Sequence, residues 1–283
     1  MRDANDWFAD LGGGTRVALV VAGTFRSDAG VLLGHVPRTS WHPLVQDEID
    51  AQGRLRQALN CLLVETPAGR VLVETGIGER LDEKMHRMRG VEGRPVVAAM
   101  NDAGFDPGSV DVVALSHLHF DHAGGLLDPD GRRAFAGARI VAQRAEWEIA
   151  FDANPRIVSG YDQAELRLVQ PFAAADAVEG ERELIPGVTV RATGGHTAGH
   201  QAVVVRGRTG TVGFFGDLCM RPWSADPTWL PSFDDFPLRS VEAKEELFSQ
   251  AADERWRIAL SHEPSRPIGR LERAATNFRY VAD

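Results

Sequence analysis

Four side chains of the kinds that bind transition metals fall within one hexapeptide, His-Leu-His-Phe-Asp-His, at His117, His119, Asp121 and His122. The apolar run 111–115 directly before them predicts a buried strand. The first two histidines are two residues apart and would share one face of an extended chain, whereas the aspartate and the third histidine are adjacent and would point in different directions. The hexapeptide therefore favours two neighbouring metal ions over a single one.

Three further residues of metal-binding type lie downstream, at His196, Asp217 and His262. Each follows an apolar run that predicts a strand, the runs being 188–192, 211–215 and 258–260. Glycine precedes both His196 and Asp217, and glycine lets the backbone approach a site closely and adopt a positive φ. A structural protein has little reason to place these side chains at three strand ends, so the pattern favours a functional site.

In this order, the seven residues resemble the motif set of the metallo-β-lactamase superfamily, and the resemblance covers roughly residues 15–270. Within that superfamily, Ser-His-Leu-His-Phe-Asp-His-Ala-Gly-Gly at 116–125 and the lack of an inserted domain are most similar to the bacterial quorum-quenching lactonases. Those enzymes open the ring of N-acyl-homoserine lactones. Related carboxylesterases and phosphotriesterases carry nearly the same ligand set, so they stay open as alternatives.

The resemblance implies a ligand set for each of two divalent ions. It assigns the first ion to His117, His119 and His196, and the second to Asp121, His122 and His262, with Asp217 as the bridge. Zinc suits imidazole and carboxylate ligands, and iron, manganese and cobalt are alternatives. The fold implied is α+β, a four-layer αβ/βα sandwich. No cysteine falls at a ligand position, which disfavours the true β-lactamases that use a cysteine ligand.

The chemistry expected of such a centre is hydrolysis. Two ions hold a bridging water, lower its pKa and so supply hydroxide for attack on a lactone or ester carbonyl. Asp121 is the candidate for carrying a proton to the alkoxide that leaves. Several lactonases have a tyrosine three residues after the bridging aspartate, where this chain has Met220, and Tyr161 is an alternative source of the phenol. Glu74 stands where relatives usually have aspartate, and would orient a ligand histidine.

Other classes compete with a lactone or ester hydrolase. A mono-iron sulfur dioxygenase or a glutathione thioester hydrolase of the same superfamily would use a related ligand set, and a metal-bound scaffold without catalysis is a third class. Four histidines lie outside the ligand set. We expect His200 to be a neighbour of the ligands or solvent-facing, His86 to lie on a solvated helix, and His35 and His42 to lie at the surface rather than in the cleft.

Composition bounds the partners. The chain has 283 residues, 43% hydrophobic and 25% charged, with a net charge of −9. This acidic balance disfavours a nucleic-acid partner, which requires a basic face. No stretch is long enough to cross a membrane, and residues 1–14 lack the basic start of a signal peptide, so we expect a cytoplasmic protein. Cys61 and Cys219 predict no disulfide framework, and a homodimer stays open.

The elements that must position the site alternate between strands and helices. Strands are predicted at 16–25, 31–36, 60–65, 70–74, 111–115, 138–142, 188–193, 201–206, 211–215 and, as the last, 256–261. Helices are predicted at 95–103, 144–151 and 240–252, the last with Ser240 as N-cap. Segments 37–58, 152–180 and 219–238 fit neither pattern and are predicted as functional loops. No linker interrupts the chain, which favours a single domain over 1–283.

Overall fold

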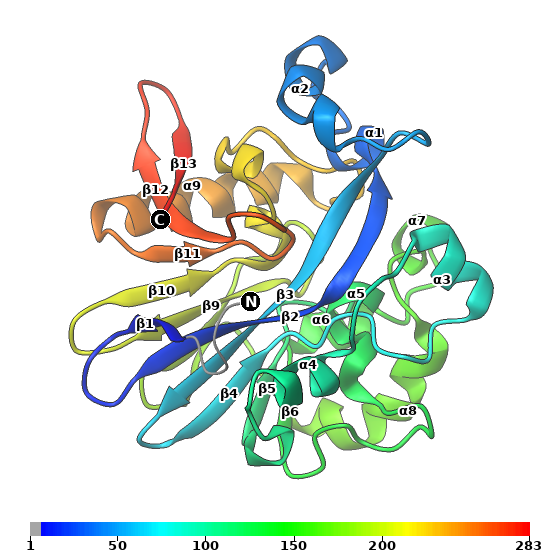
Figure 1. Cartoon of the computed structure of the whole chain (residues 1–283), viewed down its shortest axis with the longest axis vertical. Helices are drawn as coiled ribbons and strands as arrows, with labels where there is room; N and C mark the ends of the chain where they lie inside the picture. The colour runs from blue at the N-terminus through cyan, green and yellow to red at the C-terminus, as the bar shows by residue number, and fades with distance from the viewer. Residues whose placement is uncertain (1–6) are drawn as a thin grey trace.

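Two β-sheets lie face to face at the centre of the molecule, with helices on their outer sides (Figure 1). The structure is a computed structural model that describes residues 7–283. The first six residues, part of the segment predicted to lack a signal peptide, lie outside that range. The predicted α+β four-layer αβ/βα sandwich is confirmed.

The first sheet has the order β1-β2-β3-β4-β5-β6. Its strands are β1 Trp7–Asp10, β2 Arg16–Asp28, β3 Arg54–Thr66, β4 Gly69–Val73, β5 Val112–Ala114 and β6 Arg139–Val141. The pairs from β1 to β4 are antiparallel, whereas β4, β5 and β6 are parallel to one another. The carboxyl ends of β4 to β6 therefore meet at one edge of the sheet.

The second sheet has the order β13-β12-β11-β10-β9-β8-β7. Its strands are β7 Glu181–Ile185, β8 Val188–Ala192, β9 Gln201–Arg206, β10 Thr211–Phe214, β11 Arg257–Ala259, β12 Ile268–Arg273 and β13 Phe278–Ala282. All pairs are antiparallel except β10 with β11. The loops that follow β10 and β11 thus leave the sheet on the same side.

Short helices connect the strands. The α-helices are α1 Ala29–Leu32, α2 Arg38–Val45, α3 Glu83–Arg89, α4 Val96–Asp102, α5 Phe120–Ala123, α6 Arg144–Ile149, α7 Pro155–Val158, α8 Gln163–Ala173 and α9 Pro237–Asp253. Within residues 7–283, none of them combines the length and apolar character that a membrane span requires.

One apolar core fills the space between the two sheets, and another lies between each sheet and the helices that cover it, which explains the four layers. Alternate residues of β3 enter different cores: Leu62 and Val64 face the second sheet, whereas Cys61 and Leu63 face the helices that cover the first sheet. Helix α9 buries Leu247 and Phe248 against the outer face of the second sheet. Because both faces of the central strands are buried, their sequences are almost continuously apolar rather than alternating.

The sequence-based element predictions were wrong at several places. Residues 31–36 form the end of α1 and a turn, because Asp28 caps the helix by accepting a hydrogen bond from the Val31 N–H at 3.0 Å. Ser240 lies inside α9, which begins at Pro237. The strand at 256–261 is β11 and is not the last, since β12 and β13 follow.

The three predicted loops contain regular structure. Segment 37–58 includes α2 and the start of β3, and segment 152–180 includes α7 and α8. Segment 219–238 is closest to the prediction, with one 3₁₀ turn at Pro222–Ala225 before α9 begins. Helix propensity inside these segments was masked by Pro43 and Pro171, each of which lies within a helix.

Candidate metal centre

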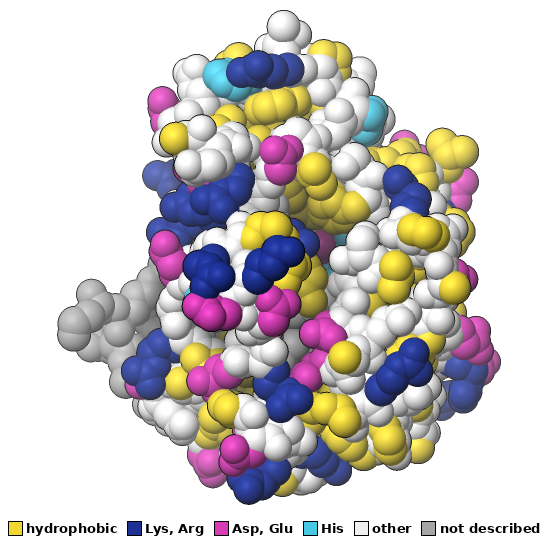
Figure 2. All heavy atoms as spheres, turned by 90° about the vertical axis from the view of Figure 1, so that its right-hand side faces the viewer, with side chains coloured by type: hydrophobic (Ala, Val, Ile, Leu, Met, Phe, Trp, Pro, Cys, Tyr) yellow, Lys and Arg dark blue, Asp and Glu magenta, His cyan; other side chains and the backbone are white. Residues whose placement is uncertain are grey.

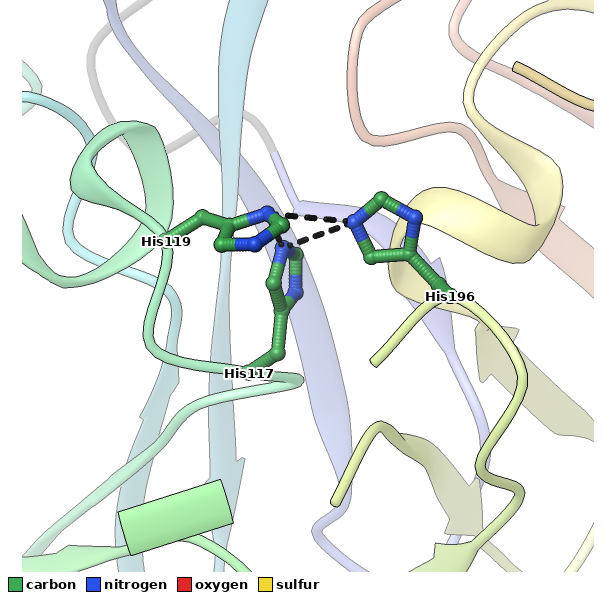
Figure 3. Close-up of side chains that lie close together, drawn as sticks. All are labelled: His117, His119 and His196. Atoms are coloured by element: carbon green, nitrogen blue, oxygen red, sulfur yellow. Dashed lines mark hydrogen bonds between the residues drawn. The ribbon is translucent and has the colours of Figure 1, made fainter. Parts of the chain in front are cut away.

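Three histidine side chains converge on one point between the sheets. The Nε2 atom of His117 lies 3.0 Å from the Nδ1 atom of His119, and the Nε2 atom of His196 lies 3.2 Å from each of those atoms. Figure 3 shows the rings of His117 and His119 reaching in from one side and the ring of His196 from the other. Nitrogen ligands about 2.0–2.1 Å from a tetrahedral zinc ion would be separated by about 3.3 Å. The cluster therefore has the spacing of a metal site.

A second group lies beside the first and consists of Asp121, His122 and His262. The Oδ2 atom of Asp121 is 3.8 Å from the Nε2 atom of His122 and 3.7 Å from the Nε2 atom of His262. Both histidine Nε2 atoms are buried and face carboxylate oxygens without the geometry of a hydrogen bond. Buried polar atoms are rarely left without a partner, so these nitrogens fit ligands of a cation.

Asp217 lies between the two groups and turns one oxygen toward each. Its Oδ2 atom is 3.4 Å from the Nε2 atom of His196. Its Oδ1 atom is 3.3 Å from the Nε2 atom of His122 and 3.0 Å from that of His262. This placement fits a carboxylate that bridges two cations.

All seven residues singled out from the sequence are thus brought together. Their ligand atoms form three overlapping groups that could hold metal ions, each group within 4.8 Å: His117, His119 and His196; His117, His122 and Asp217; Asp121, His122 and His262. The residues present fit two divalent cations.

The fold explains why these residues meet. His117 follows the end of β5, and Asp217 and His262 follow the ends of the parallel strands β10 and β11. His196 lies in the loop between β8 and β9. Loops at strand ends can place side chains from distant parts of the chain at one edge, as in other sheet-based sites.

Burial and neighbouring charges shift the pKa values in opposite directions. Burial lowers the pKa of both His117 and His119 well below the ordinary value, which keeps these rings neutral. Burial also lowers the pKa of His122, but Asp217, Asp121 and Glu74 outweigh it and raise that pKa well above the usual range. For Asp217, burial acts against the charged form, yet His122, His262 and His196 hold its pKa well below the usual value.

Hydrogen bonds from the far side of the rings orient three of the histidines. The Nδ1–H of His196 donates to the Oδ1 atom of Asp234 at 2.8 Å, and the Nδ1–H of His262 donates to the carbonyl oxygen of Ala58 at 2.8 Å. Both bonds leave the Nε2 atom directed at the centre. The Nδ1 atom of His117 lies 2.9 Å from the Ser116 hydroxyl. Such contacts fix the ring orientation and tautomer of a metal ligand.

Glu74 partly meets its expected role. Its Oε1 atom accepts a hydrogen bond from the Ser116 N–H at 3.1 Å and lies 3.5 Å from the Nδ1 atom of His122. Glu74 also has a positive φ of 66°, which is uncommon for a residue with a side chain. The Glu74 carboxylate therefore lies beside the candidate ligand His122 at a distance typical of an ion pair rather than of a hydrogen bond.

Sequence reasoning missed Glu146, which is fully buried on α6 and joins the two loops that carry the first histidine cluster. Its Oε1 atom accepts hydrogen bonds from the Leu118 N–H at 3.0 Å and the Tyr161 hydroxyl at 2.8 Å. Its Oε2 atom accepts from the Thr197 hydroxyl at 2.6 Å and the Gly199 N–H at 3.1 Å. Burial raises the pKa of Glu146, and the hydrogen bonds from Thr197, Leu118 and Tyr161 oppose that shift.

Tyr161 does not take the place of the missing phenol. Its hydroxyl donates to Glu146, and its ring packs edge-on against His119 with 4.7 Å between ring centroids. His200 is buried, and its Nδ1 atom lies 2.7 Å from the Thr193 hydroxyl, so it is a neighbour of the ligands as expected. His86 is exposed on α3, also as expected, and His35 is exposed.

A cavity of about 260 Å³ opens onto the centre. Figure 2 shows a hollow in this face of the molecule, bordered by hydrophobic side chains, with histidine and acidic groups at its floor. The cavity reaches Asp121, Asp217 and His262, and its apolar wall includes Phe25, Leu32, Phe120, Ile157, Met220 and Phe233. Of the aromatic residues in segment 219–238, Phe233 lines the cavity, whereas Trp223 and Trp229 pack against the core beside α1 and α2.

The family of the chain follows from comparison with known proteins. A profile of the metallo-beta-lactamase superfamily matches residues 56–262. The chain therefore belongs to the metallo-β-lactamase superfamily.

Relatives within this family include lactonases. An N-acyl homoserine lactonase from a Bacillus species is 32% identical over 156 residues, which are 51% of this chain and 57% of that protein. An N-acyl homoserine lactonase from Agrobacterium fabrum is 37% identical over 111 residues, or 36% of this chain and 38% of that protein. The match thus spans 57% of the length of the first relative and 38% of the length of the second.

Two solved structures share the fold over nearly the whole chain. A probable metal-dependent hydrolase from Staphylococcus aureus has a TM-score of 0.87 at 24% identity, covering 97% of this chain and 99% of that one. AidC, a dizinc quorum-quenching lactonase, has a TM-score of 0.81 at 21% identity, covering 97% and 96%. At these identities the likeness concerns the fold.

The Asp234–His196 hydrogen bond gives the first prediction. Replacing Asp234 with alanine removes the acceptor that orients His196, so we expect metal affinity to fall about 10–100-fold. Competition with a chromophoric chelator measures the change. The matched control is Asp235→Ala, which removes a neighbouring carboxylate that lines the cavity. Equal affinities for the wild type and Asp234→Ala would show that the bond does not support metal binding.

The raised pKa values give the second prediction. Burial lowers the pKa of His196, but Asp217 and Asp234 raise it above the ordinary value, and His122 is raised as well. The raised pKa values favour the protonated form of both rings in the metal-free protein, and a bound cation would have to displace these protons. We expect zinc binding to release about two protons per chain, and the affinity to weaken as pH falls.

Calorimetry in buffers of different ionisation enthalpy measures this proton release. His86 is exposed and offers a control, since His86→Asn should leave the number of released protons unchanged. A binding enthalpy that is the same in every buffer would contradict the prediction.

Proposed function

We propose that this chain is a dinuclear metal-dependent hydrolase that opens lactones, with N-acyl-homoserine lactones as the leading substrates. One observation carries the proposal: the two oxygens of Asp217 face two separate groups of ligand-type side chains. A single-ion enzyme, such as a mono-iron dioxygenase, would not need the second group, Asp121, His122 and His262, with its two buried and unpartnered nitrogens.

The relatives support the substrate class. The partial matches at 32% and 37% identity are to proteins named N-acyl homoserine lactonase, and a structural relative is described as a dizinc lactonase. We therefore propose zinc as the metal, bound by His117, His119 and His196 at one position and by Asp121, His122 and His262 at the other, with Asp217 between them. Imidazole and carboxylate ligands are those that zinc prefers.

When bound, the two cations would supply an activated water molecule and polarise the substrate carbonyl. Side chains of the protein would position the cations, transfer a proton and bind the substrate. Asp217 holds the two positions at a fixed separation through its two oxygens. Asp121, whose side chain is 10% exposed, borders both the cavity and the centre and is placed to take the proton that the attacking water loses and to pass it to the departing alkoxide. The apolar wall, with Phe25, Phe120 and Phe233, excludes water and binds the acyl chain.

The cellular setting is part of the same proposal. We propose a cytoplasmic enzyme of one domain that acts on a small molecule and has no nucleic-acid partner. The net charge of −9 supports the lack of a nucleic-acid partner, because nucleic-acid binding depends on a basic face. A homodimer is compatible with the proposal.

The experiment that tests the function combines metal analysis with a substrate screen. Protein reconstituted with zinc or manganese is assayed by elemental analysis and by a pH indicator against homoserine lactones, simple lactones, aryl esters and a phosphotriester. We expect two equivalents of metal and the highest turnover with the homoserine lactones. One equivalent of metal in fully active enzyme would contradict the dinuclear centre, and turnover of esters or phosphotriesters without lactones would contradict the substrate class.

Replacement of Asp121 tests the proton transfer. Asp121→Asn keeps an oxygen at the same position but cannot hold an exchangeable acidic proton, so kcat for a lactone should fall about 10²–10⁴-fold. A nitrophenyl ester is the control substrate, because its leaving group departs without a proton. The variant should therefore lose much less activity with this ester than with the lactone. Metal content is measured in parallel. Equal losses with the lactone and the nitrophenyl ester would contradict the proton-transfer role of Asp121.

A further inference from the structure

Gln57 is a buried side chain that the chemistry described so far does not use. It lies on β3, has 0% exposure and lines the cavity at the metal centre. Neither its Oε1 atom nor its Nε2 atom has a hydrogen-bond partner. A primary amide offers an acceptor and two donors, and leaving all of them unpaired inside a protein is unfavourable.

The other buried glutamines of the described chain are paired, so the state of Gln57 is particular to its position. The Nε2 atom of Gln143 donates to the Oε1 atom of Gln201 at 2.7 Å. The Nε2 atom of Gln201 donates to the carbonyl oxygen of Leu115 at 2.7 Å. The amides of Gln143 and Gln201 thus bond to each other and to the backbone, whereas the amide of Gln57 makes no such bond and lies at the cavity.

The surroundings of Gln57 place it beside the reacting centre. Gln57 is the cross-strand partner of Phe25, so the two side chains share one face of the sheet, and both line the cavity. The ring of Phe25 packs edge-on against His262 with 5.6 Å between centroids. The next residue of β3, Ala58, accepts the hydrogen bond from the Nδ1–H of His262. Gln57 is therefore one residue away from the strand position that orients a candidate ligand.

Neither of the two residues considered as the source of a phenol offers a hydroxyl to the substrate. Met220, at the position where a tyrosine was sought, is fully buried and lines the same cavity. The hydroxyl of Tyr161 is held by Glu146. Among the residues that line the cavity, Gln57 thus supplies a neutral amide with both a free donor and a free acceptor, set next to an apolar wall.

We infer that Gln57 recognises the acylamino group of a lactone substrate, accepting its amide N–H at Oε1 and donating from Nε2 to the lactone carbonyl. The inference rests on the proposed function and deepens it. In an α-acylamino lactone, the amide N–H group and the ring carbonyl group are attached to the same carbon, as they are in one extended residue of a peptide. A primary amide matches that pair with one acceptor and one donor. A lactone without the acylamino group satisfies only the donor of Gln57.

The test compares two substrates and two enzymes. N-hexanoyl-L-homoserine lactone has the acylamino group, and α-heptyl-γ-butyrolactone has a chain of equal length without it. The measured quantity is the ratio of kcat/KM for the first substrate to that for the second. Gln57→Met, which keeps the length of the side chain and removes its polar atoms, should lower this ratio about tenfold or more. Gln170→Met, at an exposed position on α8, is the control and should leave it unchanged.

A second measurement changes the substrate instead of the protein and begins with the wild type. Methylating the amide nitrogen of the homoserine lactone removes the N–H that Oε1 would accept. In the wild type this should lower kcat/KM about tenfold, chiefly through a higher KM, whereas Gln57→Met should show little further loss. Non-additivity of the two changes is the signature of a direct contact, which a merely structural role of Gln57 would not produce.

The outcomes separate this inference from the proposed function. A ratio that Gln57→Met leaves unchanged, or equal losses with both lactones, would overturn the acylamino contact while lactone hydrolysis stands. An additive effect of methylation and substitution would overturn it as well. Wild-type enzyme that turns over neither lactone would instead overturn the proposed function on which the inference depends.

Discussion

The carboxylate of Asp217 is the constraint on which the rest of the centre depends. It is 5% exposed and lies among three histidine nitrogens, so it is a charge removed from water that must be balanced. The pKa values of the surrounding rings shift in opposite directions, because burial lowers those of His117 and His119 while Asp217 raises those of His122 and His196. A pair of cations would balance the carboxylates and also pair the nitrogens of His122 and His262 that lack partners. Metal binding would therefore be coupled to stability as well as to chemistry.

The fold brings this charge arrangement about by joining two sheets at their strand ends. Glu146 has a central part, because its two oxygens accept from the Leu118 N–H between two histidines and from the Gly199 N–H near the third. Close packing reinforces the arrangement: a Cβ added at Gly199 would lie 2.1 Å from the backbone nitrogen of Glu146, and one added at Gly160 would lie 2.4 Å from the Nε2 atom of His119. These glycines let loops approach the centre at distances that other residues would prevent.

The ligand-type residues could be predicted from sequence because their chemistry shows in residue type alone. Four of the seven fall in one hexapeptide, and the other three follow apolar runs. The strands of the central sheets were equally visible, since burial on both faces makes them apolar. The residues that hold the candidate ligands in place were harder to predict from the sequence. Asp234 lies 38 residues beyond His196, and Glu146 lies 28 residues beyond Leu118, within a short helix whose pattern resembles any solvated helix. Their role depends on tertiary contacts, which periodicity does not encode.

The replacement of tyrosine by Met220 shows why site residues and site function must be argued separately. The ligand set is complete without the phenol, so the capacity to hold two cations does not depend on it. The phenol's role would be to donate a hydrogen bond to the substrate oxygen, and a thioether cannot do so. Within the cavity, Met220 extends the apolar wall, while the amide of Gln57, which makes no hydrogen bond, offers a neutral donor from β3. Selectivity in this protein would then come from an amide that needs a matching partner, because a buried donor and acceptor left unpaired penalise any substrate that lacks the complementary group.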